Sequence, residues 1–198
     1  MTTQLARTSS DTRTPESKLA LQRGHVLVFE HARDVPMGFW ERGFSDCWKD
    51  FQYYDLIEQT MRRGFDYRYL LVFDENDRPL ALQPLLLTNQ DLAISAGANV
   101  ARLVAKLRTH WPNFLKSRIA LAGCLVGDGK MGTMESNETA APLVAEALEK
   151  YAGSVGVRLV GFKDFPARMR SAFSSLNQAG YVRVTGFPSL ILDLNFAS

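Results

Sequence analysis

The residues best suited to chemistry in this sequence lie in a glycine-rich segment in the second half of the chain. Residues 127–132 are Gly-Asp-Gly-Lys-Met-Gly, and they follow an apolar stretch, 117–125, that predicts a buried strand. Closely spaced glycines let backbone N–H groups face outward, so a pyrophosphate can bind against them near a helix start. Lys130 would add a positive charge. The candidate cofactor-binding residues are Leu125, Val126, Gly127, Gly129, Lys130 and Gly132.

The same glycines also fit an ordinary surface turn. The segment is neither a Walker A sequence nor a dinucleotide fingerprint, because the glycine spacing differs and no Ser or Thr follows a Gly-Lys pair. Residues 133–138 separate the last glycine from the next predicted helix. Glycine supplies backbone conformations that other residues avoid, which is reason enough for a turn to contain it. Both interpretations stay open at this point.

A second candidate site follows the apolar run 157–162, which predicts another strand. Lys163 and Asp164 come directly after it, at the strand end where open α/β sheets bind their substrates. We therefore take Lys163 and Asp164 as candidate substrate-binding residues, with an exposed ion pair as the alternative. The three histidines are scattered and form neither a nucleophile pattern nor a metal-ligand pattern, so no metal is expected.

Composition sets limits on partners and compartment. The chain has 198 residues with 23 basic and 21 acidic side chains, so its net charge of +2 predicts no strong attraction to nucleic acid or to anionic lipid. No apolar run reaches the ~20 residues of a membrane-spanning helix. The two cysteines, Cys47 and Cys124, have no partner at metal-ligand spacing, which favours a reducing cytoplasm. Polar residues 1–22 predict a disordered tail before a domain over 23–198.

The elements that must position these residues are predicted by periodicity and turn chemistry. Two β-rich runs joined by Asp74-Glu-Asn-Asp-Arg78 predict a hairpin, with Pro84 indicating an edge strand or a bulge. Alternating strands and helices in the second half predict an α/β fold with one mixed sheet flanked by helices. The predicted strands are 25–30, 67–73, 79–87, 117–125, 157–162, 181–184 and 189–194, and the predicted helices are 40–51, 53–63, 100–111, 139–152 and 167–179.

Three predicted helices carry specific expectations about which side chains they bury. In 100–111 the residues Val100, Leu103, Val104, Leu107 and Trp111 recur at helical spacing, and we expect this face to pack on the sheet. The corresponding inward residues of the first two helices are Trp40, Phe44, Cys47, Trp48 and Phe51, followed by Leu56, Ile57 and Met61.

Several of these segments together resemble one family. The resemblance is carried by residues 69–73, 79–85, 90–92, 127–132, 159–166, 180–183, 187–189 and 192–198. In type and order these segments are similar to the N-terminal half of FemAB-like proteins of the GNAT superfamily, a group of aminoacyl and acyl transferases. The resemblance covers about residues 26–198 and implies a GNAT-like sheet. It also implies that the chain is the first half of a longer protein whose second half would cover an exposed apolar patch, so that self-association is possible.

The function implied by this resemblance is N-acyl transfer. A GNAT-type enzyme moves an acyl group from acetyl-CoA or another acyl-CoA, or from an aminoacyl donor, to a small-molecule or peptide amine. Carried over to this sequence, the glycine segment would bind the pyrophosphate, and Tyr181 would donate a proton to the leaving thiolate. Two alternatives remain: a non-catalytic substrate-binding or structural half-domain, and a small nucleotide-binding module.

Overall fold

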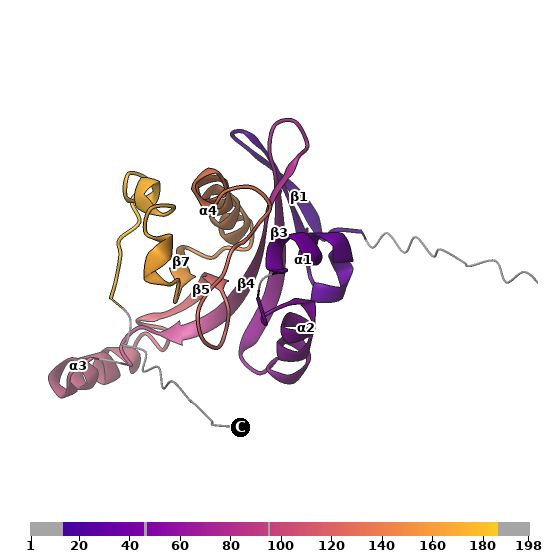
Figure 1. The fold of residues 1–198 in the computed structure, drawn as a ribbon. Coiled ribbons are helices and arrows are strands. Elements are labelled where there is room, and N and C mark those ends of the chain that lie inside the picture. Colours follow the sequence, from indigo (N-terminus) through magenta and orange to yellow (C-terminus); the bar gives the residue numbers. More distant parts are fainter. Residues whose placement is uncertain (1–13, 46, 95, 186–198) are drawn as a thin grey trace, which may run out of the picture.

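In the computed structural model, which describes residues 14–45, 47–94 and 96–185, the chain forms one mixed β-sheet with helices on both faces (Figure 1). Within those residues the strand order is β1-β2-β3-β4-β5-β7, and β6 pairs separately with β4. The predicted α/β class with a mixed sheet is confirmed. The strands are β1 (Ser17–Leu21), β2 (Gly24–Phe29), β3 (Phe65–Phe73), β4 (Pro79–Asp91), β5 (Lys116–Gly123), β6 (Gly132–Thr133) and β7 (Leu159–Lys163).

The helices divide the core into two halves. Helix α4 (Asn137–Ser154) covers one face of the sheet, and α1 (Met37–Phe44) and α2 (Phe51–Thr60) cover the other, as Figure 1 shows. Along β3, Leu70 and Val72 pack in the α4 half, and Tyr69 and Leu71 pack in the α1/α2 half. This alternation is the two-residue period of a strand that is buried on both faces.

The amino-terminal part corrects the boundary of the predicted tail. Residues 17–21, placed in a disordered tail by their polar surroundings, form strand β1 and pair antiparallel with β2. The hairpin turns at Gly24, whose φ of 119° and close approach to the Phe73 carbonyl exclude a larger residue. Five residues of half-exposed strand give little hydrophobic signal, so a prediction based on composition missed them. Residues 1–13 lie outside the described part.

The central hairpin of β3 and β4 is confirmed. The Asp74 carboxylate accepts the N–H groups of Asn76 at 2.8 Å and Arg78 at 2.9 Å, which fixes the turn. Pro84, however, lies in a central strand, so the edge-strand expectation is wrong. On the side away from β3, β4 pairs with β5 from Leu85 onward and with β6 only at residues 81–82. Pro84 therefore lies in a gap of the ladder on that side.

A parallel crossover unit completes the sheet. Strands β5 and β7 run parallel, from Ile119 opposite Leu159 to Gly123 opposite Lys163, and α4 connects them. The prediction of strand, helix and strand in this region is confirmed. The Ser136 hydroxyl caps α4 by accepting the Thr139 N–H at 3.2 Å.

Helices α1 and α2 bury a different set of side chains from the predicted one. Helix α1 ends at Phe44, so Trp48 falls in the following loop and is 74% exposed instead of inward. In α2, Leu56 faces solvent while Tyr54 and Glu58 are buried, and Met61, just past the end of the helix, is also exposed. Hydrophobicity alone does not predict a buried carboxylate on this face. The carboxylate can be buried because polar partners hydrogen-bond to it.

The segment after β7 also differs from its prediction. The helix expected over 167–179 is instead two short 3-10 helices, Ala167–Met169 and Ser174–Asn177, with Phe173 between them at φ −90° and ψ 1°. Phe173 packs there against Phe162 and Phe165, with ring centroids 4.8 and 5.0 Å away. Residues 181–184 are not a strand. The strand expected over 189–194 lies outside the described residues.

Helix α3 (Ala98–Arg108) forms where expected but does not pack as expected. The sequence predicted that its apolar face would lie on the sheet, yet Val104 is its one fully buried residue. Val100, Leu103 and Trp111 are 50%, 58% and 63% exposed. Figure 1 shows the reason: α3 lies beyond the ends of β4 and β5, away from both sheet faces.

Candidate functional site

The glycine segment forms a loop at the carboxyl ends of the parallel strands. It leaves β5 at Gly123 and returns through Gly132 in β6, which pairs with β4, so the loop does not open α4 directly. Close packing explains two of the glycines. A Cβ on Gly129 would lie 2.4 Å from the Lys163 carbonyl oxygen, and one on Gly132 would lie 2.2 Å from the Phe44 ring. Steric packing therefore favours glycine at both positions, against backbone at Gly129 and against an aromatic side chain at Gly132.

Lys163 and Asp164 are brought to this loop, as their position after β7 suggested. The Gly129 N–H donates to the Asp164 carbonyl oxygen at 2.9 Å, and the Lys163 ammonium donates to the Leu125 carbonyl at 3.4 Å. Lys163 and Asp164 also form an ion pair with each other. The two sequence candidates are thus one site, although one of the loop's N–H groups is already used within the protein.

A buried lysine that the sequence did not single out lies against the same loop. Lys49 is only 4% exposed, and its ammonium donates to the Asp128 carbonyl at 2.6 Å and to the Cys124 sulfur at 3.2 Å. Its Nζ also lies 5.2 Å from the centroid of the Trp48 ring. Lys49 therefore fixes the inner, carbonyl-lined side of the loop from the α1–α2 connection.

Cys124 and Tyr53 complete this polar cluster. The Cys124 thiol is buried and donates to the Val126 carbonyl at 2.7 Å. The Tyr53 hydroxyl donates to the same carbonyl at 3.2 Å and lies 3.6 Å from the sulfur. Burial, followed by the hydrogen bond with Cys124, raises the pKa of Tyr53 well above its usual value. Tyr53 therefore remains a protonated donor through the neutral range.

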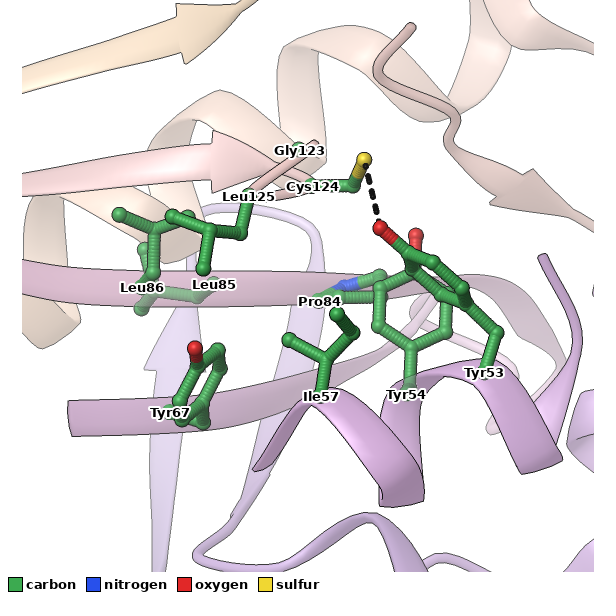
Figure 2. Close-up of a pocket in the computed structure, with 10 residues that line it drawn as sticks. All are labelled: Tyr53, Tyr54, Ile57, Tyr67, Pro84, Leu85, Leu86, Gly123, Cys124 and Leu125. Atoms are coloured by element: carbon green, nitrogen blue, oxygen red, sulfur yellow. Dashed lines mark hydrogen bonds between the residues drawn. The ribbon is translucent and has the colours of Figure 1, made fainter. Parts of the chain in front are cut away.

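A narrow apolar cavity adjoins Tyr53 and Cys124. Figure 2 shows it between α2, the middle of β4 and the end of β5, with the tyrosine hydroxyl directed at the sulfur. Its volume of about 10 Å³ is room for roughly one water molecule. Ile57, Leu85 and Leu86 line its apolar side. The arrangement therefore combines an apolar wall with two polar groups at one end.

A larger open hollow lies beside this cluster, where α1 meets α2. Its volume is about 390 Å³, within the range of small-molecule sites. Phe44 contributes to its wall, and the same ring packs against Gly132 of the loop. Glu41 and Asp50 supply two carboxylates at its rim, so the hollow favours a cationic or amine-bearing ligand.

Tyr181, the sequence candidate for a proton donor, lies on the other face of the sheet. Its ring packs against Phe162 at 5.9 Å, in the half of the molecule covered by α4. Burial, and then the neighbouring Glu149 carboxylate, raise the pKa of Tyr181. The structure therefore brings the glycine loop together with Lys163 and Asp164, but places Tyr53 and not Tyr181 beside Cys124.

Other polar clusters do not form a further site. The Glu58 carboxylate accepts from the Ala32 N–H at 2.9 Å and the Tyr69 hydroxyl at 3.1 Å, and it lies 2.5 Å from His31 Nδ1. These contacts tie α2 to β3 and to the segment after β2, which explains the buried carboxylate. Among the described residues no group of three potential metal ligands occurs, and no helix is long and apolar enough to cross a membrane.

Comparison with known proteins gives no further assignment. No protein-family model matches the chain, and neither the curated proteins nor the solved structures searched give a significant match. The site must therefore be interpreted from its own geometry.

Proposed function

We propose that the chain is a GNAT-type N-acyltransferase domain, which transfers an acyl group from acyl-CoA or an aminoacyl donor to an amine. One observation carries the proposal. A glycine loop lies at the carboxyl ends of the parallel strands β5 and β7, between the first strand and the connecting helix α4. Ligands of open α/β sheets bind outside the carboxyl ends of the strands, so this is the expected edge for the donor.

The outer side of the loop fits an anionic donor. Val126, Gly127 and Asp128 are exposed, while the inner side is held by Lys49. Lys163 lies at one end of the loop, and the Lys130 ammonium lies 5.6 Å from the Phe44 ring centroid at the other. Two cations around an exposed glycine turn can bind a pyrophosphate electrostatically.

Tyr53 and the hollow between α1 and α2 supply the acceptor side in this proposal. The hollow, with Glu41 and Asp50 at its rim, would hold the amine as an ammonium, and one of these carboxylates would accept the proton that the amine must lose before it attacks. Tyr53, protonated at neutral pH, would donate a hydrogen bond to the thiolate that leaves the acyl group, and that thiolate would take its proton from the attacking amine. Tyr181 remains the alternative donor predicted from the sequence.

One observation favours the non-catalytic alternative. The Gly129 N–H is bonded to Asp164, and a Cβ at Gly129 would meet the backbone, so the loop is complete without any ligand. A half-domain that only shapes a groove would need the loop for packing alone. This reading predicts no affinity for a thioester donor.

Calorimetry with acetyl-CoA separates the two functions. We expect saturable heat in the micromolar range for the natural chain, and loss of that heat in Gly129→Ala because the added Cβ displaces the loop. Gly153→Ala is the matched control, since nothing lies within 4 Å of its added Cβ. If the natural chain gives no heat while its fold is intact, the acyltransferase proposal is wrong.

Thiol release during acyl transfer distinguishes the two tyrosines. With an amine acceptor that supports turnover, we expect Tyr53→Phe to lower kcat by about 100-fold or more, the usual loss when one hydrogen-bond donor to a developing negative charge is removed. Tyr181→Phe should change kcat less than about twofold if its hydroxyl only packs under α4. The reverse result would return the proton-donor role to Tyr181.

A further inference from the structure

The charge of the chain is nearly balanced overall but not along its length. Residues 92–118, which run from the end of β4 through α3 into the first three residues of β5, contain five basic and no acidic residues, whereas the rest of the chain has 18 basic and 21 acidic. We call residues 92–118 the basic excursion. The net charge of +2 conceals this local excess, so the excursion has an electrostatic character that the whole chain lacks.

The basic excursion is held to the sheet by specific hydrogen bonds, while many of its apolar side chains are exposed. The Arg108 guanidinium donates to both oxygens of the Asp91 carboxylate at 2.7 and 2.8 Å, and its Nε donates to the Phe114 carbonyl. The Leu92 N–H bonds the Leu115 carbonyl at 2.9 Å and closes the base of the excursion. These contacts fix the C-terminal end of α3 while its outer surface stays in solvent.

Apolar and basic side chains lie side by side on that outer surface. Helical spacing places Val100, Leu103 and Leu107 along one stripe of α3, and the first two are at least half exposed. Arg102 and Lys106 are exposed on the adjoining polar side, and no ion pair of either is recorded within the described residues. Other large exposed apolar residues of the excursion are Leu92, Ile94 and Trp111.

We propose that the basic excursion docks on an anionic lipid surface, with α3 lying in the plane of the interface. A helix with a basic face, an aliphatic face and a nearby tryptophan has the chemistry of an interfacial helix. Its aliphatic residues would enter the acyl boundary, while Arg102 and Lys106 would remain among the anionic headgroups. This docking needs no membrane-spanning segment and is independent of the acyltransferase proposal.

The same observations disfavour the other occupants. A second copy meeting the excursion face to face would bring the exposed Arg102 and Lys106 of one chain against those of the other. Nucleic acid would pair with the positive charges. It would not bury Val100, Leu103 and Ile94, because phosphates and base edges form no apolar layer for them to enter. An anionic lipid surface pairs with the basic side chains and buries the apolar ones.

Vesicle co-sedimentation of the full chain tests the proposal. We expect binding to vesicles of phosphatidylcholine with about one-third phosphatidylglycerol, weak or no binding to phosphatidylcholine alone, and release as salt is raised. Arg102→Glu with Lys106→Glu should weaken binding by roughly tenfold or more. Leu103→Asp should weaken it comparably although it adds only one charge, because it removes the inserted side chain.

Matched variants elsewhere on the surface make the result specific. Leu56→Asp changes an equally exposed leucine on α2, and Arg168→Glu with Arg170→Glu reverses two exposed charges after β7. Neither should alter vesicle binding by more than about twofold. Absence of binding to anionic vesicles overturns the proposal. So does binding that Leu103→Asp leaves intact, or a charge-dependent dimer or nucleic-acid complex in place of vesicle binding.

Discussion

Helices α3 and α4 have similar apolar periodicity but opposite environments. In α4, the stripe of Val144, Ala147, Leu148 and Tyr151 is buried against the sheet. In α3, an equally regular stripe is covered by the body of the protein only at Val104. Both helices were predicted at nearly their observed positions, so the difference lies in their attachment and not in their local sequence.

The comparison shows what apolar periodicity can and cannot establish. It establishes that a helix has an apolar face, because the same 3.6-residue period governs every amphipathic helix. Whether the protein itself covers that face depends on where the connections place the helix. Helix α4 connects two adjacent parallel strands and must cross the sheet, whereas α3 connects antiparallel strands and can extend beyond their ends.

The largest expected effect is on global stability. Replacing Leu148, which is fully buried, with Ala should lower the free energy of unfolding by about 2–5 kcal/mol. Leu103→Ala, at the corresponding position of the α3 stripe, should change it by less than about 0.5 kcal/mol, because the side chain is largely in solvent. Urea unfolding of both variants measures the difference. Equal losses would show that α3 packs on the body after all.

The helix caps give an intermediate effect. Ser136→Ala removes the hydroxyl that caps α4 and should cost about 1 kcal/mol in the same urea experiment. Helix α3 begins at Gly97, which offers no side-chain cap, and nothing lies within 4 Å of an added Cβ there. Gly97→Ser should therefore stabilise α3 by a few tenths of a kcal/mol.

The Gly97→Ser gain should be local, since α3 is attached mainly through its ends. Hydrogen exchange of α3 amides should slow in this variant, while the urea midpoint stays unchanged. A rise in the urea midpoint would mean that α3 unfolds together with the sheet, which would contradict the contrast between the two helices.

The smallest effect is the pH dependence of the α3 attachment. Hydrogen bonds from Arg108 first, and from the Ala93 N–H second, lower the pKa of Asp91 to about 2. A depressed carboxyl pKa adds stability above its usual value near 4, and that stability is lost as the pH falls through about 2. Exchange of α3 amides should therefore lose protection between these pH values. In Asp91→Asn this protection should already be reduced at neutral pH and show no step.

The sequence predicted what local signals determine. The β3–β4 hairpin follows from its turn residues, and the order of β5, α4 and β7 follows from periodicity and strand-like composition. The glycine loop and Lys163 could be predicted to meet, because both follow strands of one parallel pair. These features need no information about distant segments.

Features set by distant contacts were not predictable. Lys49 and Cys124 are 75 residues apart, and nothing in the spacing of either indicates the other. Tyr53 was predicted only as the first residue of a helix, and its hydroxyl gains a role only when α2 lies over the end of β5. The 167–179 helix failed because aromatic packing around Phe173 replaces regular helix geometry.

Hydrogen–deuterium exchange of the full chain tests the account most directly, since it observes both regions in one sample. With acetyl-CoA we predict that amide exchange slows in residues 124–132 and does not change in the basic excursion. With anionic vesicles we predict that amide exchange slows in α3 and its flanks and does not change in the glycine loop. Protection of the same segment by both ligands, or of neither segment by its own ligand, would contradict the separation of a donor site from a lipid-docking element.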